Sequence, residues 1–308
     1  MAEAAPALAA RTPTLFERLR RAADTPAVLG PLLAAPAVGL LAALVAYPLV
    51  FGVWLGLTSA TLGNAGHFVG LANFTALFAD PTYRAATFYS ILYTVGSEAL
   101  KLSIGLALAM VLNQRFRGYR AARSLMLLPW VAPTVLAVLA WQWLLDPQFS
   151  GISWLFERLG LIHHAINFLG TEWNARVSLI VVNVWRGVPY FAIGFMAGLQ
   201  SIPAELLEAA AIDGAGGWAS FRHIIWPLLA PLTTILVCFS SIWTITDFQL
   251  IWTMTQGGPV NGTQVFTTLA YQRAIPSGNL GQGAAIAIST LPFMIVLAYF
   301  ALRAMREK

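Results

Sequence analysis

The sequence predicts an all-α membrane protein with six transmembrane helices. Composition, long apolar stretches and the positions of the basic residues together support this. Of the 308 residues, 58% are hydrophobic and only 10% are charged, whereas soluble domains carry roughly 25% charged residues. The mean hydropathy is +0.71. We therefore expect membrane lipid to surround much of the chain. The net charge of +5 does not indicate a nucleic-acid partner, because the basic residues collect beside the apolar stretches.

Six apolar stretches are long enough to cross a bilayer, for which about 20 residues suffice. They are expected at 28–57, 85–112, 124–145, 174–199, 224–254 and 281–302. Residues 1–26 are polar, and the apolar stretch after them is too long for a signal peptide and lacks a clear cleavage site. We therefore expect a tail at 1–26 and one six-helix transmembrane domain at 27–308.

Four ionisable residues lie inside these stretches. Glu98 and Lys101 are three residues apart and can form an ion pair on one helix face, which lowers the cost of their burial. Arg186 and Asp247 lie in different stretches, where ionisable groups suggest function, although the two could simply pair with each other. The single Cys238 excludes an internal disulfide and is interpreted as a small packing residue.

The basic residues predict the orientation of the chain. Twelve of them lie in the N-terminal tail, the 114–123 turn, the 201–226 loop and the C-terminus, whereas the opposite loops hold four although they are longer. Basic residues concentrate on the cytoplasmic side of membrane proteins. Both termini and the 201–226 loop are therefore expected in the cytoplasm.

Several catalytic motifs are absent from the sequence. A phosphate-binding loop needs Gly-Lys-Ser/Thr, but the only lysines are Lys101, which follows leucine, and Lys308, the last residue. The chain lacks HExxH, GxSxG and CxxC. The adjacent His163 and His164 would point in different directions, so no metal site is expected. We therefore expect a non-catalytic chain that binds no cofactor itself.

The 201–226 segment is a short amphiphilic stretch between two strongly apolar ones. Ser201 can cap a helix, Pro203 suits its first turn, and Gly214 can end it in a left-handed conformation. A second short helix is expected at 217–223. This pattern predicts a compact knob that docks into another protein, although an ordinary connecting loop would also fit it.

The order of residues in the knob resembles the EAA loop of permease subunits in ABC importers. The matching positions follow the family's spacing: Glu208, Ala209, Ala210, Gly214, Ile224 and Pro227. Trp226 stands where the family usually has leucine. In that family the loop is the coupling helix that inserts into the ATPase subunit. The resemblance assigns this coupling role to Glu205, Glu208, Ala209, Ala210, Asp213 and Gly214.

Most of the chain resembles the sugar-import branch of the binding-protein-dependent permeases, the maltose type. The similar stretches are 68–74 with 80–81, 128–133, 183–190 and 255–259. The resemblance implies the type I ABC importer permease fold with a cytoplasmic coupling helix, in a bacterial inner membrane. The partners that it implies are a second similar permease, two ATPase subunits that bind ATP and Mg, an external solute-binding protein and a sugar.

The resemblance also implies a substrate site near the middle of the membrane. Its residues would be Trp130, Thr134, Asn183, Arg186, Gly187, Tyr190, Trp243, Thr244 and Asp247. Sugars need flat aromatic faces for their CH surfaces and a few polar groups for their hydroxyls. Arg186 and Asp247 replace less polar residues of the maltose protein, so the substrate need not be maltose. Aromatic side chains that only pack between helices are the alternative.

The expected function is inward transport of a sugar or sugar derivative by alternating access, driven by ATP hydrolysis in partner subunits. The alternative is a secondary transporter coupled to an ion gradient, for which the four ionisable residues within the spans would suit proton transfer. The EAA loop favours the ABC permease, because a lone carrier does not need it. A membrane enzyme would require a catalytic cluster, and the sequence contains none.

Overall fold

The computed structural model describes residues 25–306, so nearly all of the expected 1–26 tail lies outside the described residues. The described part of the chain is helical and contains no β-strand, only two isolated bridges in the loop after the first span. This confirms the all-α prediction. The chain divides into two units, Met1–Trp54 and Leu55–Lys308, which are described separately below.

The described part of the first unit consists of apolar helix. It contains α2 (Pro26–Leu41), the π-helical turn η1 (Ala42–Ala46) and most of α3 (Tyr47–Gly56). Together these elements form a candidate span, Leu29–Gly56, and no residue in its most apolar window is buried. The π-helical turn ends two residues before Pro48, whose ring would clash with the carbonyl of residue 44 in a regular α-helix. The wider turn lets the helix continue through this proline.

The second unit contains the remaining helices of the described chain. Their bounds are α4 (Ala72–Ala79), α5 (Pro81–Leu112), α6 (Tyr119–Met126), α7 (Leu128–Val131), α8 (Thr134–Leu144), α9 (Gly151–Arg158), α10 (Glu172–Gln200), α11 (Ala204–Ile212), α12 (Gly217–Ser220), η2 (Phe221–Ile225), α13 (Trp226–Ile245), α14 (Gln249–Thr255), α15 (Phe266–Ala274), α16 (Leu280–Ile288) and α17 (Leu291–Arg306). In the described residues five helical segments are long and apolar enough to span a membrane, or six if one bent pair counts as a span.

The bent pair corrects the third predicted span. Instead of one helix at 124–145, the chain forms α6 and α7 and then α8, with a bend of 95° between them. Ala132 and Pro133 both have extended backbone angles at the bend. The ring of Pro133 disfavours the helical conformation of the residue before it, so the helix ends there and restarts at Thr134.

The fifth predicted span, 224–254, also differs. The helix begins earlier, because α12, η2 and α13 run on without a break from Gly217, and it ends at Ile245. The short helix expected at 217–223 is therefore the first part of this span. Asp247 lies in the gap before α14 and accepts a hydrogen bond from the backbone N–H of Leu250 at 3.3 Å. A side-chain acceptor of this kind satisfies a backbone donor at a helix start.

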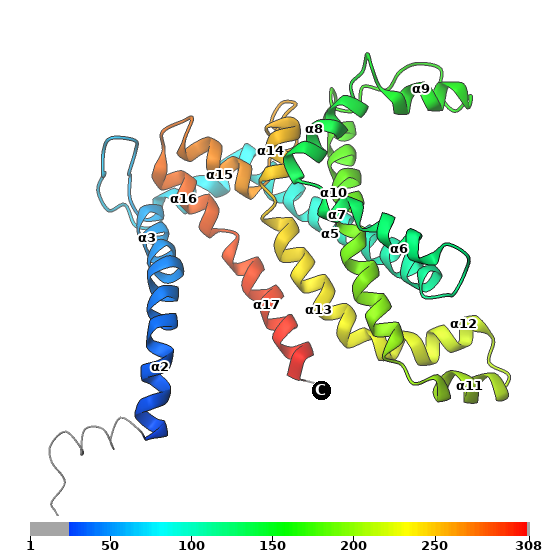
Figure 1. Ribbon diagram of the computed structural model, residues 1–308. Coiled ribbons are helices and arrows are strands. Elements are labelled where there is room, and N and C mark those ends of the chain that lie inside the picture. The colour runs from blue at the N-terminus through cyan, green and yellow to red at the C-terminus, as the bar shows by residue number, and fades with distance from the viewer. Residues whose placement is uncertain (1–24, 307–308) are drawn as a thin grey trace, which may run out of the picture. The chain divides into compact units, whose positions relative to one another are not determined.

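Three long helices form the centre of the second unit. α5 packs along α10, α13 contacts both, and α17 packs against α13 (Figure 1). Large aromatic side chains fill the space between them, including Tyr89, Tyr93, Phe191 and Phe195, all fully buried. Gly105 permits close packing, because a Cβ there would overlap Phe191. Apolar packing therefore surrounds the polar side chains of α5, α10 and α13.

Candidate functional site

The three central helices and α7 border a small cavity that gathers most of the predicted substrate residues. Its volume is about 40 Å³. The lining residues are Lys101, Trp130, Asn183, Arg186, Gly187, Tyr190, Ser240, Trp243 and Thr244. Seven of the nine residues assigned by resemblance are in this lining. The other two, Thr134 and Asp247, lie beside it and contact Arg186.

Arg186 and Asp247 form an ion pair, one of the arrangements left open by the sequence. The guanidinium Nη2 of Arg186 donates to Asp247 Oδ2 at 2.6 Å, and the two side chains are 25% and 6% exposed. Tyr93 and Asn183 also donate to Asp247 Oδ2, at 3.3 and 3.2 Å. A buried carboxylate needs such partners, so Asp247 links side chains from α5 and α10 to the gap after α13.

Lys101 is at the centre of a second polar cluster. Its ammonium donates to Glu98 Oε1 at 2.6 Å, to Ser240 Oγ at 3.0 Å and to Thr244 Oγ1 at 2.8 Å. Its side chain passes over Gly187, where a Cβ would overlap Lys101 Cδ. The predicted Glu98–Lys101 pair is therefore present, and it ties α5 to α13.

Three aromatic rings border the cavity. Trp130 stacks on Tyr190 with ring centroids 5.5 Å apart and an interplanar angle of 15°. Trp243 contacts both rings, at 5.9 and 5.2 Å. Trp130 and Trp243 are about half exposed, at 43% and 51%. Exposed aromatic faces beside polar groups are the surfaces on which sugar rings bind.

Two of the predicted residues also contact the Lys101 cluster, and two residues that sequence reasoning missed line the cavity. The Thr244 hydroxyl is engaged by Lys101 and Glu98, and Gly187 makes room for Lys101. Lys101 and Ser240 line the cavity but were not assigned to it. The position of Lys101 inside a span was the available signal, but its partners on α13 are 139 and 143 residues away.

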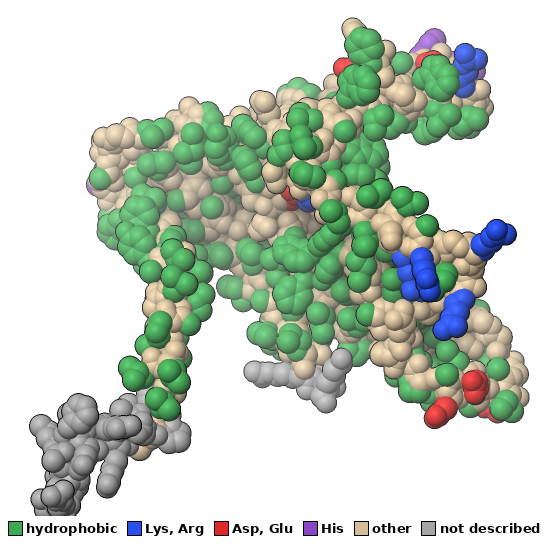
Figure 2. Space-filling view, viewed as in Figure 1, with side chains coloured by type: hydrophobic (Ala, Val, Ile, Leu, Met, Phe, Trp, Pro, Cys, Tyr) green, Lys and Arg blue, Asp and Glu red, His purple; other side chains and the backbone are tan. Residues whose placement is uncertain are grey.

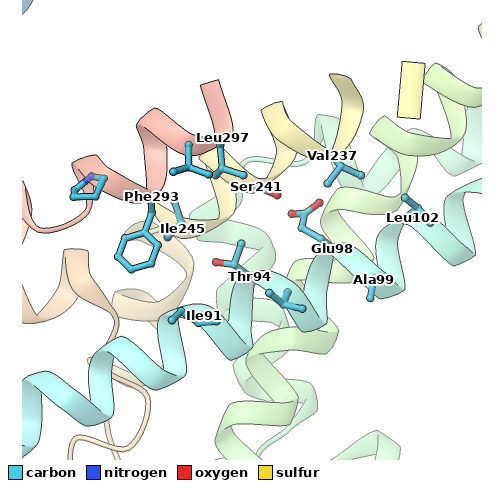
Figure 3. A pocket seen from close by; sticks show the side chains of 13 residues that line it. Ile91, Thr94, Glu98, Ala99, Leu102, Val237, Ser241, Ile245, Phe293 and Leu297 are labelled. Atoms are coloured by element: carbon cyan, nitrogen blue, oxygen red, sulfur yellow. The ribbon is translucent and has the colours of Figure 1, made fainter. Parts of the chain in front are cut away.

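A larger cavity of about 600 Å³ lies between α5, α13 and α17 (Figure 3). Ten of its thirteen lining side chains are apolar, and the polar ones are Thr94, Glu98 and Ser241. Thr94 already donates to the backbone oxygen of Ser90. A hydroxyl-rich ligand would lose most of its hydrogen bonds in such a cavity. The polar and aromatic cavity is therefore the better sugar site, although it is by far the smaller of the two.

The predicted coupling segment forms α11, which ends in a Schellman motif. Gly214 has φ +79°, its N–H donates to Ala211, and the N–H of Ala215 donates to Ala210 at 2.8 Å. These bonds satisfy the last carbonyls of the helix. Ser201 does not cap α11 as expected, since its hydroxyl donates back to Gly198.

The coupling residues differ in exposure. Five of the six are exposed: Glu205, Glu208, Ala209, Asp213 and Gly214. The sixth, Ala210, is buried. On the face shown in Figure 2, acidic side chains gather over α11 and basic side chains over the turn between α5 and α6. The surface of α11 is thus acidic and partly apolar.

A family model described as binding-protein-dependent transport system inner membrane component matches residues 101–304. The chain belongs to this family. The permease is therefore a multi-pass inner-membrane protein, as the sequence predicted. The matched region contains every predicted substrate and coupling residue, and it begins at Lys101.

Curated relatives cover nearly the whole permease. The trehalose/maltose transport system permease protein of Thermococcus litoralis is 30% identical over 275 residues, which is 89% of this chain and 91% of the relative. The sn-glycerol-3-phosphate transport system permease protein of Yersinia pestis is 33% identical over 287 residues, which is 90% of this chain and 94% of the relative. Both relatives are named as permeases of transport systems.

A solved structure supports the fold. It is a chain of a bacterial alginate ABC transporter in complex with an alginate pentasaccharide-bound periplasmic protein. The TM-score is 0.77 at 19% identity, with 94% of this permease and 96% of that chain covered. The permease therefore has the fold of an ABC importer permease, which confirms the predicted all-α membrane fold.

Proposed function

We propose that this permease is the transmembrane subunit of an ATP-driven importer and moves a sugar or sugar derivative into the cytoplasm by alternating access. The observation that carries the proposal is the polar and aromatic cavity between α5, α10 and α13. Ion pairs and hydroxyl groups are costly inside a membrane domain. Beside three aromatic rings, they form the combination that binds sugars.

The cavity in this chain alone is too small for a sugar. Pockets for small-molecule ligands measure roughly 300–1,000 Å³, whereas this cavity measures about 40 Å³, close to the volume of one water molecule. A sugar can enter only if the helices move apart or if another subunit completes the site. The half-exposed Trp130 and Trp243 are suited to face a second, similar permease subunit across such a site.

The energy source is proposed to lie in partner subunits. The chain has no Gly-Lys-Ser/Thr motif for binding ATP, so two ATPase subunits would bind ATP and Mg. The exposed face of α11 would dock into them and transmit their closure to α10 and α13, the helices before and after it. An external solute-binding protein would deliver the sugar, as the periplasmic protein of the alginate complex carries a saccharide.

Reconstitution of the complete complex in proteoliposomes tests this function. Uptake of the sugar released from its external binding protein should require ATP on the side of the ATPase subunits and should persist when ionophores collapse all ion gradients. Uptake that needs no ATP and stops when a proton gradient is collapsed would instead support the secondary transporter, with Glu98 and Lys101 as its proton-carrying groups.

A further inference from the structure

Lys101 lines the proposed substrate cavity, but its ammonium group is already engaged by neighbouring side chains. An ammonium group has three N–H donors, and the donors of Lys101 are matched by Glu98, Ser240 and Thr244 within 3.0 Å. The Ser240 hydroxyl also donates to Glu98 Oε1 at 3.0 Å. The charge of Lys101 is therefore cancelled by Glu98, and its hydrogen-bonding capacity is used up.

The second cation of the cavity is balanced in the same way. Arg186 is paired with Asp247 at 2.6 Å. The two basic residues that line the cavity thus each contact one buried carboxylate, and the local net charge is zero. An anionic substrate would have to draw Lys101 or Arg186 away from its carboxylate. That carboxylate would then be buried and unpaired, which is strongly unfavourable.

The unused hydrogen-bonding groups beside these ion pairs favour a ligand that carries hydroxyl groups. Asn183 is 3% exposed, and its Oδ1 has no hydrogen-bond partner in the described part of the chain. Its Nδ2 donates to Asp247, which fixes the amide so that oxygen is the open acceptor. Arg186 donates to Asp247 and weakly to Thr134, so some of its five N–H groups remain available.

A hydroxyl group can satisfy both of these neighbours, because it donates to Asn183 and accepts from Arg186. A carboxylate, phosphate or sulfonate only accepts and would leave Asn183 Oδ1 unsatisfied. Building on the proposed function, we propose that the Glu98–Lys101 and Arg186–Asp247 pairs determine specificity and that the permease carries a neutral, hydroxyl-rich sugar rather than an anionic one.

Glu98 is the residue through which this selectivity can be changed. Its Oε1 holds Lys101, whereas its Oε2 has no partner in the described residues. Figure 3 shows Glu98 among the side chains that line the larger apolar cavity. Glu98→Gln keeps an oxygen for Lys101 but removes the negative charge. It therefore leaves an uncompensated cation at the sugar cavity.

The test is uptake by the complete complex in ATP-driven proteoliposomes, with four labelled probes. Maltose and trehalose are neutral, and sn-glycerol 3-phosphate and an alginate trisaccharide are anionic. The wild type should import neutral probes in preference to anionic ones. Glu98→Gln should raise the anionic-to-neutral uptake ratio by about tenfold, as expected when one charge at a binding site loses its partner. Asp247→Asn, which frees Arg186, should raise the ratio in the same direction.

Two controls separate specificity from stability. Glu172→Gln removes the partner of Arg176, an ion pair at the start of α10 and outside the cavity, and should leave the ratio unchanged. Glu98→Gln combined with Lys101→Met removes both charges and should restore the preference for neutral probes. The same external binding protein supplies every variant, so its own selectivity cancels when variants are compared with the wild type.

The outcomes are distinguishable. A wild type that imports anionic probes in preference to neutral ones overturns the inference but leaves ATP-driven import intact. An unchanged ratio in both Glu98→Gln and Asp247→Asn also overturns it. Uptake that needs no ATP counts against the proposed function itself, and with it against the inference that depends on it.

Discussion

Residue 187 is a glycine, so no Cβ lies against the side chain of Lys101. A Cβ at Gly187 would overlap Lys101 Cδ, so the glycine determines whether the lysine can reach Ser240 and Thr244 on α13. Gly187 was assigned to the substrate site by resemblance. In the structure it also leaves space for the Lys101 side chain between α5 and α10.

Gly187→Ala should therefore destabilise the permease and displace Lys101. Overpacking of a filled interior costs about 1–3 kcal/mol, so we expect a lower Tm of the purified complex and reduced sugar uptake. Gly96→Ala is the matched control, because its Cβ would lie 3.5 Å from Ile180 Cδ1, an ordinary contact. An equal Tm for the two variants would contradict this role of Gly187.

The helix ends of this permease determine where its side chains face. α11 ends at Ile212, and Gly214, two residues later, has a φ of +79° that suits a residue without Cβ. Two backbone bonds then close the helix and direct the chain toward α12. The acidic face of α11 is thereby held in one orientation, which a docking element requires.

Gly214→Val should uncouple ATP hydrolysis from transport. A β-branched residue in the left-handed region costs about 1 kcal/mol or more, so the end of α11 should rearrange while the bundle stays folded. The measurement is ATP hydrolysis stimulated by the loaded external binding protein. Gly217→Ala is the control, since open space surrounds its Cβ position and its φ is not positive. Full stimulated turnover in an assembled Gly214→Val complex would refute the coupling role of α11.

Across the second unit, the basic turn and α11, for which we propose a coupling role, lie at the same end. The turn follows α5, and Gln200 at the end of α10 donates to Asn113 at the end of α5 at 3.4 Å. At the opposite end, two arginines are neutralised by acidic partners, in the pairs Arg176–Glu172 and Arg273–Asp80. In the described residues, net positive charge therefore concentrates at the end that holds the turn, which strengthens the predicted cytoplasmic orientation of that end.

Cysteine labelling in spheroplasts checks this orientation. In a Cys238→Ser background, an impermeant maleimide should label Ala65→Cys in the loop after the first span. Arg117→Cys, in the basic turn, should react only after the membrane is permeabilised. Both positions are exposed in the structure, so access to the reagent depends on the side of the membrane alone. Labelling of Arg117→Cys from outside would reverse the topology.

The sequence predicts features that depend on neighbouring residues better than features that depend on residues far apart in the chain. The α5 and α10 spans begin and end within four residues of their predicted limits, because hydropathy and end caps such as Asp80 are local. The bend at Pro133 and the gap at Asp247 also have local signals, which the length of the apolar runs obscured.

The candidate site was predictable only in part. Trp130, Tyr190 and Trp243 were placed by resemblance to a family, and the structure brings them together. The contacts of Lys101 with Ser240 and Thr244 join positions far apart in the chain. A single sequence gives no measure of such distances, so the lysine was interpreted as half of an ion pair within one helix.

The measurement that tests the central claim most directly is sugar uptake by variants of the Arg186–Asp247 pair. Arg186→Leu or Asp247→Asn alone breaks the buried pair, which typically costs about 3–5 kcal/mol, so each should lower the amount of assembled complex. Combined, they leave no unpaired charge, and the amide oxygen introduced by Asp247→Asn can still accept from Tyr93 and Asn183. The account predicts that the double variant assembles at near the wild-type level and hydrolyses ATP but imports no sugar. Recovery of import in the double variant would show that the pair is only structural and would contradict the assignment of this cavity as the substrate site.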